Sequence, residues 1–201
     1  MKKKMRNLLL STVVVGLSLL ACSEPVAAQH KPRPAQVWSP DVGLASQLGT
    51  LEAVEEFTVQ PPKGYKFVKG AGPDGAVIYG WSGEKRSTGT APQFLILIFS
   101  PESEVRQSDM EPGLAALLVS FATGKTDWKL GPIEHGVVNG HPFVRTRWEG
   151  FEASLGYKVF GFSYLTIVGK KVIHLSSQDV EPFKTEALGL AESAARTFRK
   201  K

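Results

Sequence analysis

The chain has 201 residues, which is enough for one domain of ordinary size. Its formal charge of +5 comes from 24 basic and 19 acidic residues, and four of the basic residues lie within the first six positions. The remaining 20 basic and 19 acidic residues nearly cancel, which argues against nucleic-acid binding, since that needs a clustered basic face. The single cysteine excludes an intramolecular disulfide.

Residues 1–21 have the three parts of a secretory signal peptide: a basic start, an apolar run and small residues at its end. The apolar run, from Leu8 to Ala21, is shorter than the roughly 20 residues that a transmembrane helix needs. A buried core helix is the alternative, but the lysine cluster and the terminal position argue against it. We therefore expect this segment to direct export and to be removed.

The end of this segment, Leu19-Leu20-Ala21-Cys22, resembles the lipobox of bacterial lipoproteins. The resemblance implies that the Cys22 thiol is linked to a diacylglyceryl group and that the mature chain begins with this residue. Two or three lipid chains attach a protein stably to a membrane, whereas one chain holds it only marginally. In Gram-negative cells of the familiar type, Ser23 after the cysteine implies sorting to the outer membrane, facing the periplasm. An unmodified thiol is the alternative.

Residues 22–50 are predicted to form a lipid-anchored tether, because their first half is rich in Pro, Ala and polar residues without an apolar period. Trp38 is an exception that could dock on the domain, but a loose tether is the preferred interpretation. The residues after Asp41 favour either a weak helix or more linker. We expect a single domain over residues 51–201.

Four short segments with the character of β-strands follow, and the last two are rich in β-forming residues and bounded by Gly, Pro and Ser. They are residues 56–60, 64–70, 76–81 and 94–100. The last segment, FLILIFS, is apolar on both faces, so we expect a central strand that is covered on both sides.

Between two of these strands, Gly70, Gly72 and Gly75 have the spacing G-x-G-x-x-G. In a dinucleotide-binding fold this motif joins a strand to a helix whose N-terminus holds a pyrophosphate. Here Pro73-Asp74-Gly75 is a turn signal, and a strand-like segment follows in place of a helix. We therefore predict a hairpin loop and no nucleotide.

Two amphipathic helices are predicted from apolar side chains at three- and four-residue spacing. The first lies within residues 108–125, where Pro112 suits the first turn and Gly124 the end. Its apolar stripe comprises Met110, Leu114, Leu117, Leu118 and Phe121. The second helix lies within residues 179–201, and its stripe comprises Phe183, Ala187, Leu190, Ala191, Ala194 and Phe198.

Four further strands are predicted between the helices, over residues 132–138, 141–150, 156–169 and 171–177. The Asn139-Gly140 pair between the first two is a strong hairpin signal. Apolar and charged residues alternate after it, so we expect one buried and one solvated face.

This order of elements predicts an α+β fold in which a mainly antiparallel sheet packs with two helices. The segments FTVQPPKGYKFV and NGHPFVRTRWEGF, the middle helix and the closing helix ending in AARTFR resemble the Mog1/PsbP-like sandwich over roughly residues 52–199. Members of that superfamily are mostly non-enzymatic binding or assembly proteins. The resemblance implies a binding role, but it carries over no contact residues.

Glu134, His135 and His141 surround the predicted hairpin turn and could come close together. Two imidazoles and a carboxylate can bind a metal, but no further ligand with a recognised spacing is present. Solvated turn histidines are therefore the preferred interpretation, and His174 is expected at a polar position on a sheet face. Ser163 lies within a strand and lacks the turn of a nucleophile elbow. We predict no catalytic residue, no metal and no cofactor.

Four aromatic and two arginine side chains could form a surface for a protein partner, because aromatic residues and Arg are favoured at interfaces. They are Tyr79, Trp81, Arg145, Arg147, Trp148 and Phe151. The alternative places the aromatic rings in the core and the arginines on the solvent face of the sheet.

Together these features predict a cell-envelope lipoprotein, held at a membrane through Cys22, with a non-enzymatic protein-binding or assembly role. Its partner would be an unknown envelope protein. One alternative is an envelope carrier of a small apolar or lipid ligand, bound between the sheet and the helices. A further alternative is a hydrolase or metalloenzyme that uses His135 and His141.

Overall fold

In the computed structural model, residues 36–72, 75–181 and 183–201 are described. The described residues all belong to one compact unit. The predicted signal peptide and the lipid attachment at Cys22 therefore lie outside the described residues.

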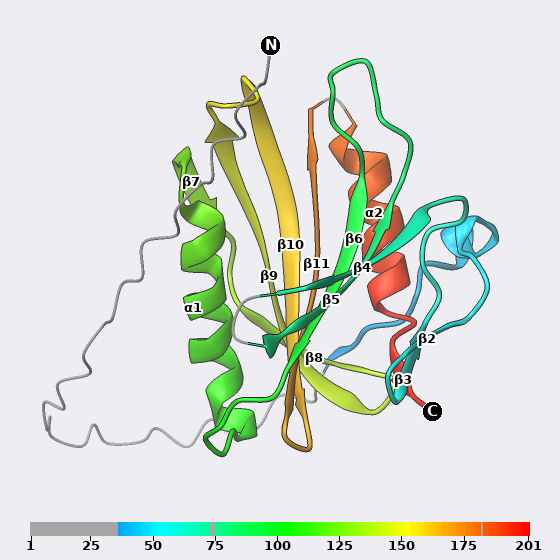
Figure 1. The fold of residues 1–201 in the computed structure, drawn as a ribbon, viewed down its shortest axis with the longest axis vertical. Helices are drawn as coiled ribbons and strands as arrows, with labels where there is room; N and C mark the ends of the chain where they lie inside the picture. Colours follow the sequence, from blue (N-terminus) through cyan, green and yellow to red (C-terminus); the bar gives the residue numbers. More distant parts are fainter. Residues whose placement is uncertain (1–35, 73–74, 182) are drawn as a thin grey trace, which may run out of the picture. The chain divides into compact units, whose positions relative to one another are not determined.

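The main element is a sheet of nine strands among the described residues, which Figure 1 shows between the two helices. Its strand order is β1 (Gln36–Val37), β8 (Glu134–Val138), β9 (His141–Glu152), β10 (Tyr157–Val168), β11 (Lys171–Val180), β6 (Gln93–Phe99), β5 (Val77–Ser82) and β4 (Lys66–Ala71), with β7 (Lys125–Leu130) also beside β9. All neighbouring strands are antiparallel except β1 and β8. A smaller sheet has the order β12 (Arg199–Lys200), β3 (Phe57–Val59) and β2 (Glu52–Val54).

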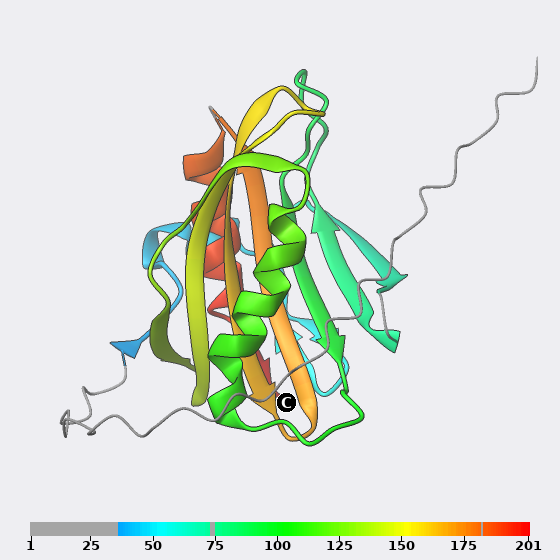
Figure 2. The same ribbon diagram turned by 90° about the vertical axis from the view of Figure 1, so that its left-hand side faces the viewer.

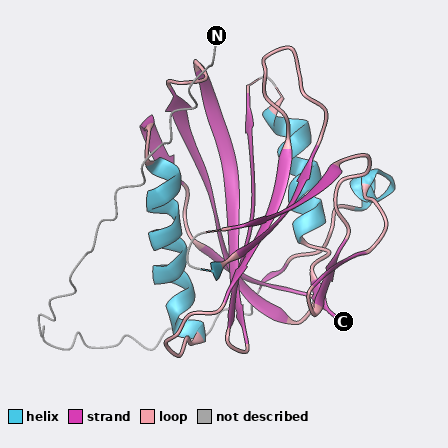
Figure 3. Cartoon of the chain, viewed as in Figure 1, coloured by secondary structure: helices cyan, strands magenta, loops and turns pink. Residues whose placement is uncertain are grey.

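Helices α1 (Met110–Ala122) and α2 (Lys184–Ala195) cover opposite faces of the large sheet, as Figures 1 and 2 show. Two short 3₁₀ helices, η1 (Val42–Gln47) and η3 (Gln107–Asp109), lie in the connections. Figure 3 shows the same arrangement by type of element. The predicted α+β architecture, a mainly antiparallel sheet packed with two helices, is confirmed.

Each helix buries most of its apolar stripe in a separate core, but Phe183 of the second predicted stripe precedes α2 and packs against the α1 side. The α1 side includes Met110, Leu114, Leu118, Val144, Trp148 and Leu165. The α2 side includes Phe162, Tyr164, Leu190, Ala191, Ala194 and Phe198. Full burial of one large apolar side chain stabilises the fold by about 1.5–3 kcal/mol, so the two stripes hold both helices on the sheet.

The Asn139-Gly140 turn confirms the predicted hairpin. Both residues have positive φ angles, 47° and 84°, and Val138 of β8 faces His141 of β9 across the turn. Positive φ at both central positions defines the mirror-image turn that suits twisted strands. β9 then continues far enough to pair with β8, β7 and β10, which makes it the strand that carries the site described below.

The glycine-rich segment forms the predicted hairpin loop. β4 ends at Ala71 and β5 begins at Val77, and the two strands pair directly. The backbone N–H of Gly72 donates to the carbonyl of Ala76 at 2.8 Å. A strand follows the loop, so the strand-to-helix geometry of a dinucleotide site is absent from this segment.

Part of the predicted tether belongs to the folded domain, so the boundary expected at residue 51 is too late. β1 pairs with β8, and Trp38 is only 3% exposed. The indole lies against Gly136 of β8, where a Cβ would come within 2.4 Å of the ring. The bare backbone at Gly136 therefore provides the space in which Trp38 docks.

β6 lies near the centre of the sheet as predicted, between β11 and β5, but only one of its faces is fully buried. Phe94 and Ile96 are buried on the α2 side, whereas Leu95 and Leu97 remain partly exposed. The expectation of cover on both faces is wrong because α1 packs against β9 and β10 instead of β6.

Candidate functional site

A cavity of about 580 Å³ lies between helix α2 and the strands β9 and β10. Its apolar lining includes Leu130, Phe160, Phe162 and Leu188. Its charged lining comprises Lys129, Arg147, Glu149, Lys184 and Glu192. We call this cavity the α2 groove; its volume is within the range of about 300–1,000 Å³ typical of small-molecule sites.

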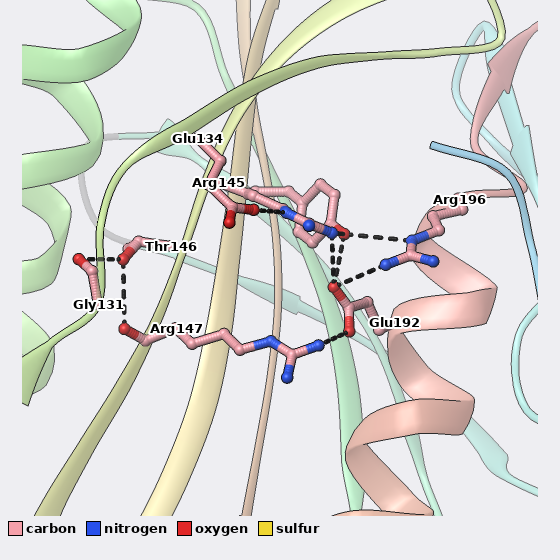
Figure 4. Close-up of polar contacts among 8 residues, drawn as sticks. Gly131, Glu134, Arg145, Thr146, Arg147, Glu192 and Arg196 are labelled. Atoms are coloured by element: carbon pink, nitrogen blue, oxygen red, sulfur yellow. Dashed lines mark hydrogen bonds and ion pairs between the residues drawn. The ribbon is translucent and has the colours of Figure 1, made fainter. Parts of the chain in front are cut away.

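Glu192 of α2 lines the groove and brings three arginines together. Its carboxylate pairs with Arg145 Nη1 at 3.0 Å, Arg147 Nη2 at 2.5 Å and Arg196 Nη2 at 3.0 Å. The hydroxyl of Tyr164 donates to the same carboxylate at 2.8 Å. Figure 4 shows these groups converging from the sheet and from α2. A carboxylate this enclosed is stable in its charged form only because both oxygens have such partners.

The pKa values of this cluster are set by burial and by its charges. Burial alone would raise the pKa of Glu192, but the Tyr164 hydrogen bond and the three guanidinium charges outweigh it, so the pKa is lowered. Burial and the nearby Glu192 charge raise the pKa of Tyr164 to about 12. At neutral pH the carboxylate is ionised and the phenol keeps its proton. The cluster therefore has the properties of a structural charge network, since neither group is poised to exchange a proton.

Arg145 is fixed from several sides. Its guanidinium lies 4.2 Å from the centre of the Trp38 ring, within range of a cation–π interaction. Its Nε donates to Glu134 at 2.6 Å, and its Nη1 donates to the Tyr164 hydroxyl at 2.9 Å. The docked N-terminal segment and the Glu192 cluster thus support one another.

Arg147 is the most exposed member of the cluster, with 72% of its side chain accessible. Its described side-chain hydrogen bond uses only Nη2, toward Glu192. Lys184, also in the lining, lies 3.4 Å above the centre of the Phe160 ring and pairs with Glu181 at 2.7 Å. The groove therefore combines an apolar wall with cations that solvent can reach.

Only some of the residues that were predicted to form a partner surface are exposed. Tyr79 and Trp81 are buried in the core on the α2 side, and Trp148 is buried beneath α1. Phe151 is partly exposed near the end of β9. The prediction is wrong for the three buried rings because each lies on a strand face covered by another layer. Arg145 and Arg147, from the same predicted set, are brought together at Glu192.

The predicted histidine cluster does not assemble. His135 faces Val144 across the β8–β9 ladder, whereas His141 faces Val138, so their side chains project to opposite faces of the sheet. His135 Nε2 lies 2.6 Å from Glu111 of α1. No group of three or more metal-binding side chains occurs within the described part of the chain. The geometry gives no support to the metalloenzyme alternative.

Several residues of the site were missed from the sequence, namely Tyr164, Lys184, Glu192 and Arg196. Glu192 and Arg196 were placed only in a helix, although their spacing of four residues favours an ion pair. A carboxylate within the alanine-rich stripe of residues 187–195 was the available signal, since a buried charge needs partners.

No known protein-family model matches the sequence, and no curated protein matches it either. The domain is similar to the solution structure of cyanobacterial PsbP (CyanoP) from Synechocystis sp. PCC 6803, with a TM-score of 0.54 and 12% identity over 79% of this chain and 96% of that chain. It is also similar to LpqN of Mycobacterium tuberculosis, described as involved in cell envelope biogenesis, with a TM-score of 0.53 and 8% identity over 75% of this chain and 83% of that one.

A structure from Bacteroides thetaiotaomicron VPI-5482 has a TM-score of 0.48 and 11% identity over 76% of this chain. This chain spans only 48% of that protein's length. Among the described helices, none is both long and apolar enough to cross a bilayer. At such low identities the likeness concerns the fold, and the domain has the PsbP-like fold that its sequence resembled.

Proposed function

We propose that this protein is a non-enzymatic binding protein of the bacterial cell envelope, held at a membrane by a lipidated Cys22, whose ligand occupies the α2 groove. The observation that carries the proposal is the groove itself, a cavity of about 580 Å³ with an apolar wall and a cationic edge. Small-molecule sites combine these two features, since apolar walls supply affinity and a few polar groups fix orientation.

Binding is favoured over catalysis by the state of the polar groups in the groove. The Glu192 carboxylate accepts from Tyr164 and pairs with three arginines, and these partners lower its pKa, so it is a weak acceptor for a substrate proton. The phenol of Tyr164 has a pKa of about 12 and is committed to Glu192. These groups shape and charge a site without supplying a base or a nucleophile.

The envelope location is supported by the lipobox at residues 19–22 and by the fold that the domain shares with LpqN, a protein involved in cell envelope biogenesis. An outer-membrane position facing the periplasm remains the expectation from Ser23. The ligand could be a segment of an envelope partner or a small apolar or lipid molecule. The size of the groove favours the second.

Photo-cross-linking in growing cells tests this proposal on the full chain. A benzophenone amino acid replaces Thr185, which is exposed and lines the groove, or Glu186, the exposed neighbour outside the groove, as the matched control. After illumination, mass spectrometry identifies what is attached. We expect a stoichiometric adduct at position 185 and little at position 186. Equal adducts at both positions, or none at position 185, would overturn the assignment of the groove.

A further inference from the structure

We propose that the ligand of the α2 groove is a long-chain fatty acid, with its carboxylate at Arg147 and its acyl chain against the wall formed by Phe160, Phe162 and Leu188. This inference rests on the proposed function, because it specifies the chemistry of the ligand in the same groove. It is carried by the combination of apolar and cationic groups in the lining.

The acyl chain is matched by the apolar wall. Phe160 and Phe162 are separated by one residue on β10, so both rings lie on the face of the sheet that α2 covers. Leu188 of α2 lies across the groove from them, and Leu130 of β7, which is 52% exposed, extends the apolar lining outward.

The carboxylate is matched by the surplus of positive charge. Lys129, Arg147 and Lys184 line the groove against Glu149 and Glu192. Both carboxylates already have cations from outside the lining. Glu149 pairs with Lys158 at 3.0 Å, and Glu192 pairs with Arg145 and Arg196.

Arg147 is the group best placed to bind an anion. Its guanidinium is largely exposed and its described side-chain hydrogen bond uses one nitrogen, so its planar donors can also form a charge-assisted pair with a ligand carboxylate. Lys184 cannot replace it in this geometry, since a single ammonium over the Phe160 ring lacks the two-pronged donor pattern. A neutral amphiphile of equal length, such as an alcohol, would fill the apolar wall but would offer Arg147 only an uncharged acceptor.

The test uses the full lipidated chain in phosphatidylcholine nanodiscs with a photoreactive palmitate. Labelled peptides are mapped by mass spectrometry, with unlabelled palmitate or hexadecanol as competitors of equal chain length. We expect labels on peptides that contain Phe160 or Leu188, displaced by palmitate at least about tenfold more effectively than by hexadecanol, as loss of one charge-assisted hydrogen bond predicts.

Variants of Arg147 test its contact with the ligand carboxylate separately from the stability of the fold. Arg147→Gln should weaken groove labelling by about tenfold or more, whereas Arg147→Lys should restore part of it. Arg106→Gln, at an exposed arginine outside the lining, is the matched control and should bind like the wild type. Equal competition by hexadecanol, or unchanged labelling of Arg147→Gln, would overturn the fatty-acid assignment but leave groove binding intact. Absence of label from the groove peptides, with no adduct at position 185 in cells, would overturn both.

Discussion

Some charged side chains of this domain are buried and need partners of opposite charge, and Glu192 is the strongest case. Its side chain is only 7% exposed, and three arginines surround it. Removing one partner of a buried charge network leaves the others without compensation. Stability and the shape of the groove therefore depend on the same carboxylate.

Glu192→Ala should lower the free energy of unfolding by about 3 kcal/mol, toward the lower end for buried ion pairs because Arg147 stays solvated and Arg145 keeps Glu134. Urea denaturation followed by tryptophan fluorescence measures the change. Glu104→Ala, at an exposed carboxylate paired with Arg106, is the control and should change stability by less than about 0.5 kcal/mol. Equal effects of the two substitutions would contradict the network.

His174 should make the domain sensitive to mildly acidic pH. It is buried near Phe121 of α1, its Nε2 has no hydrogen-bond partner among the described residues, and burial lowers its pKa from 6.5 to about 4. Between these values the unfolded chain binds more protons than the folded chain, so stability falls as pH falls. The loss from pH 6.5 to pH 4 should be about 3 kcal/mol.

His174→Leu should remove most of this loss, because leucine has no proton to bind. The measurement is the free energy of unfolding at several pH values, compared with wild type, since a carboxylate whose pKa is lowered by folding, such as Glu192, also contributes a loss of stability as pH falls. His135→Leu, at an exposed imidazole, is the control and should retain most of the wild-type slope. An unchanged slope in His174→Leu would show that the imidazole is not buried as a neutral group.

The packing of individual side chains was the hardest feature to predict from the sequence. Alternation along β9 predicted that Arg145 and Arg147 share a face, and they do, at Glu192. It could not predict which face a second layer covers, so Trp148 was considered both for a surface and for the core. Burial of Glu192 depends on contacts between segments about 45 residues apart, which no local pattern records.

At the scale of elements, the sequence predicted well the turns, helices and strands that depend on residues close together in the chain. The Asn139-Gly140 turn, the two helices and the four predicted strands between them lie where their patterns placed them. β7 was not predicted, because its residues alternate poorly and a register shift interrupts its pairing with β9 between Thr126 and Lys129. β1 was missed because its pairing depends on Gly136, about 100 residues later.

Gly136→Val should displace Trp38 and release the first strand. The added side chain would meet the indole ring, so stability should fall by about 1–3 kcal/mol, as for overpacked cores, and tryptophan fluorescence should become easier to quench with acrylamide. Gly70→Val is the matched control on β4, where a Cβ meets nothing within 4 Å. Similar quenching in both variants would mean that Trp38 does not dock at Gly136.

At the scale of the whole molecule, the docked segment limits how far the domain can stand from a membrane anchor. Gln36, where β1 begins, lies 14 positions after Cys22, so the fully extended distance is at most about 50 Å. Trp38 enters the domain beside Arg145, which pairs with Glu192 in the lining of the α2 groove. A lipidated Cys22 would therefore keep the start of β1 within about 50 Å of the anchor.

Cys22→Ala should abolish the anchor that this arrangement requires. Cells fed a radioactive fatty acid should label the wild type and not the variant, because the variant lacks the thiol to which the diacylglyceryl group is attached. The variant should also leave the membrane fraction or remain as an uncleaved precursor, since cleavage follows lipidation in the lipoprotein pathway that the lipobox implies. Ser23→Ala keeps the thiol and serves as the control, with labelling equal to the wild type. Equal labelling of Cys22→Ala would refute the anchor, and the α2 groove would then need another route to its ligand.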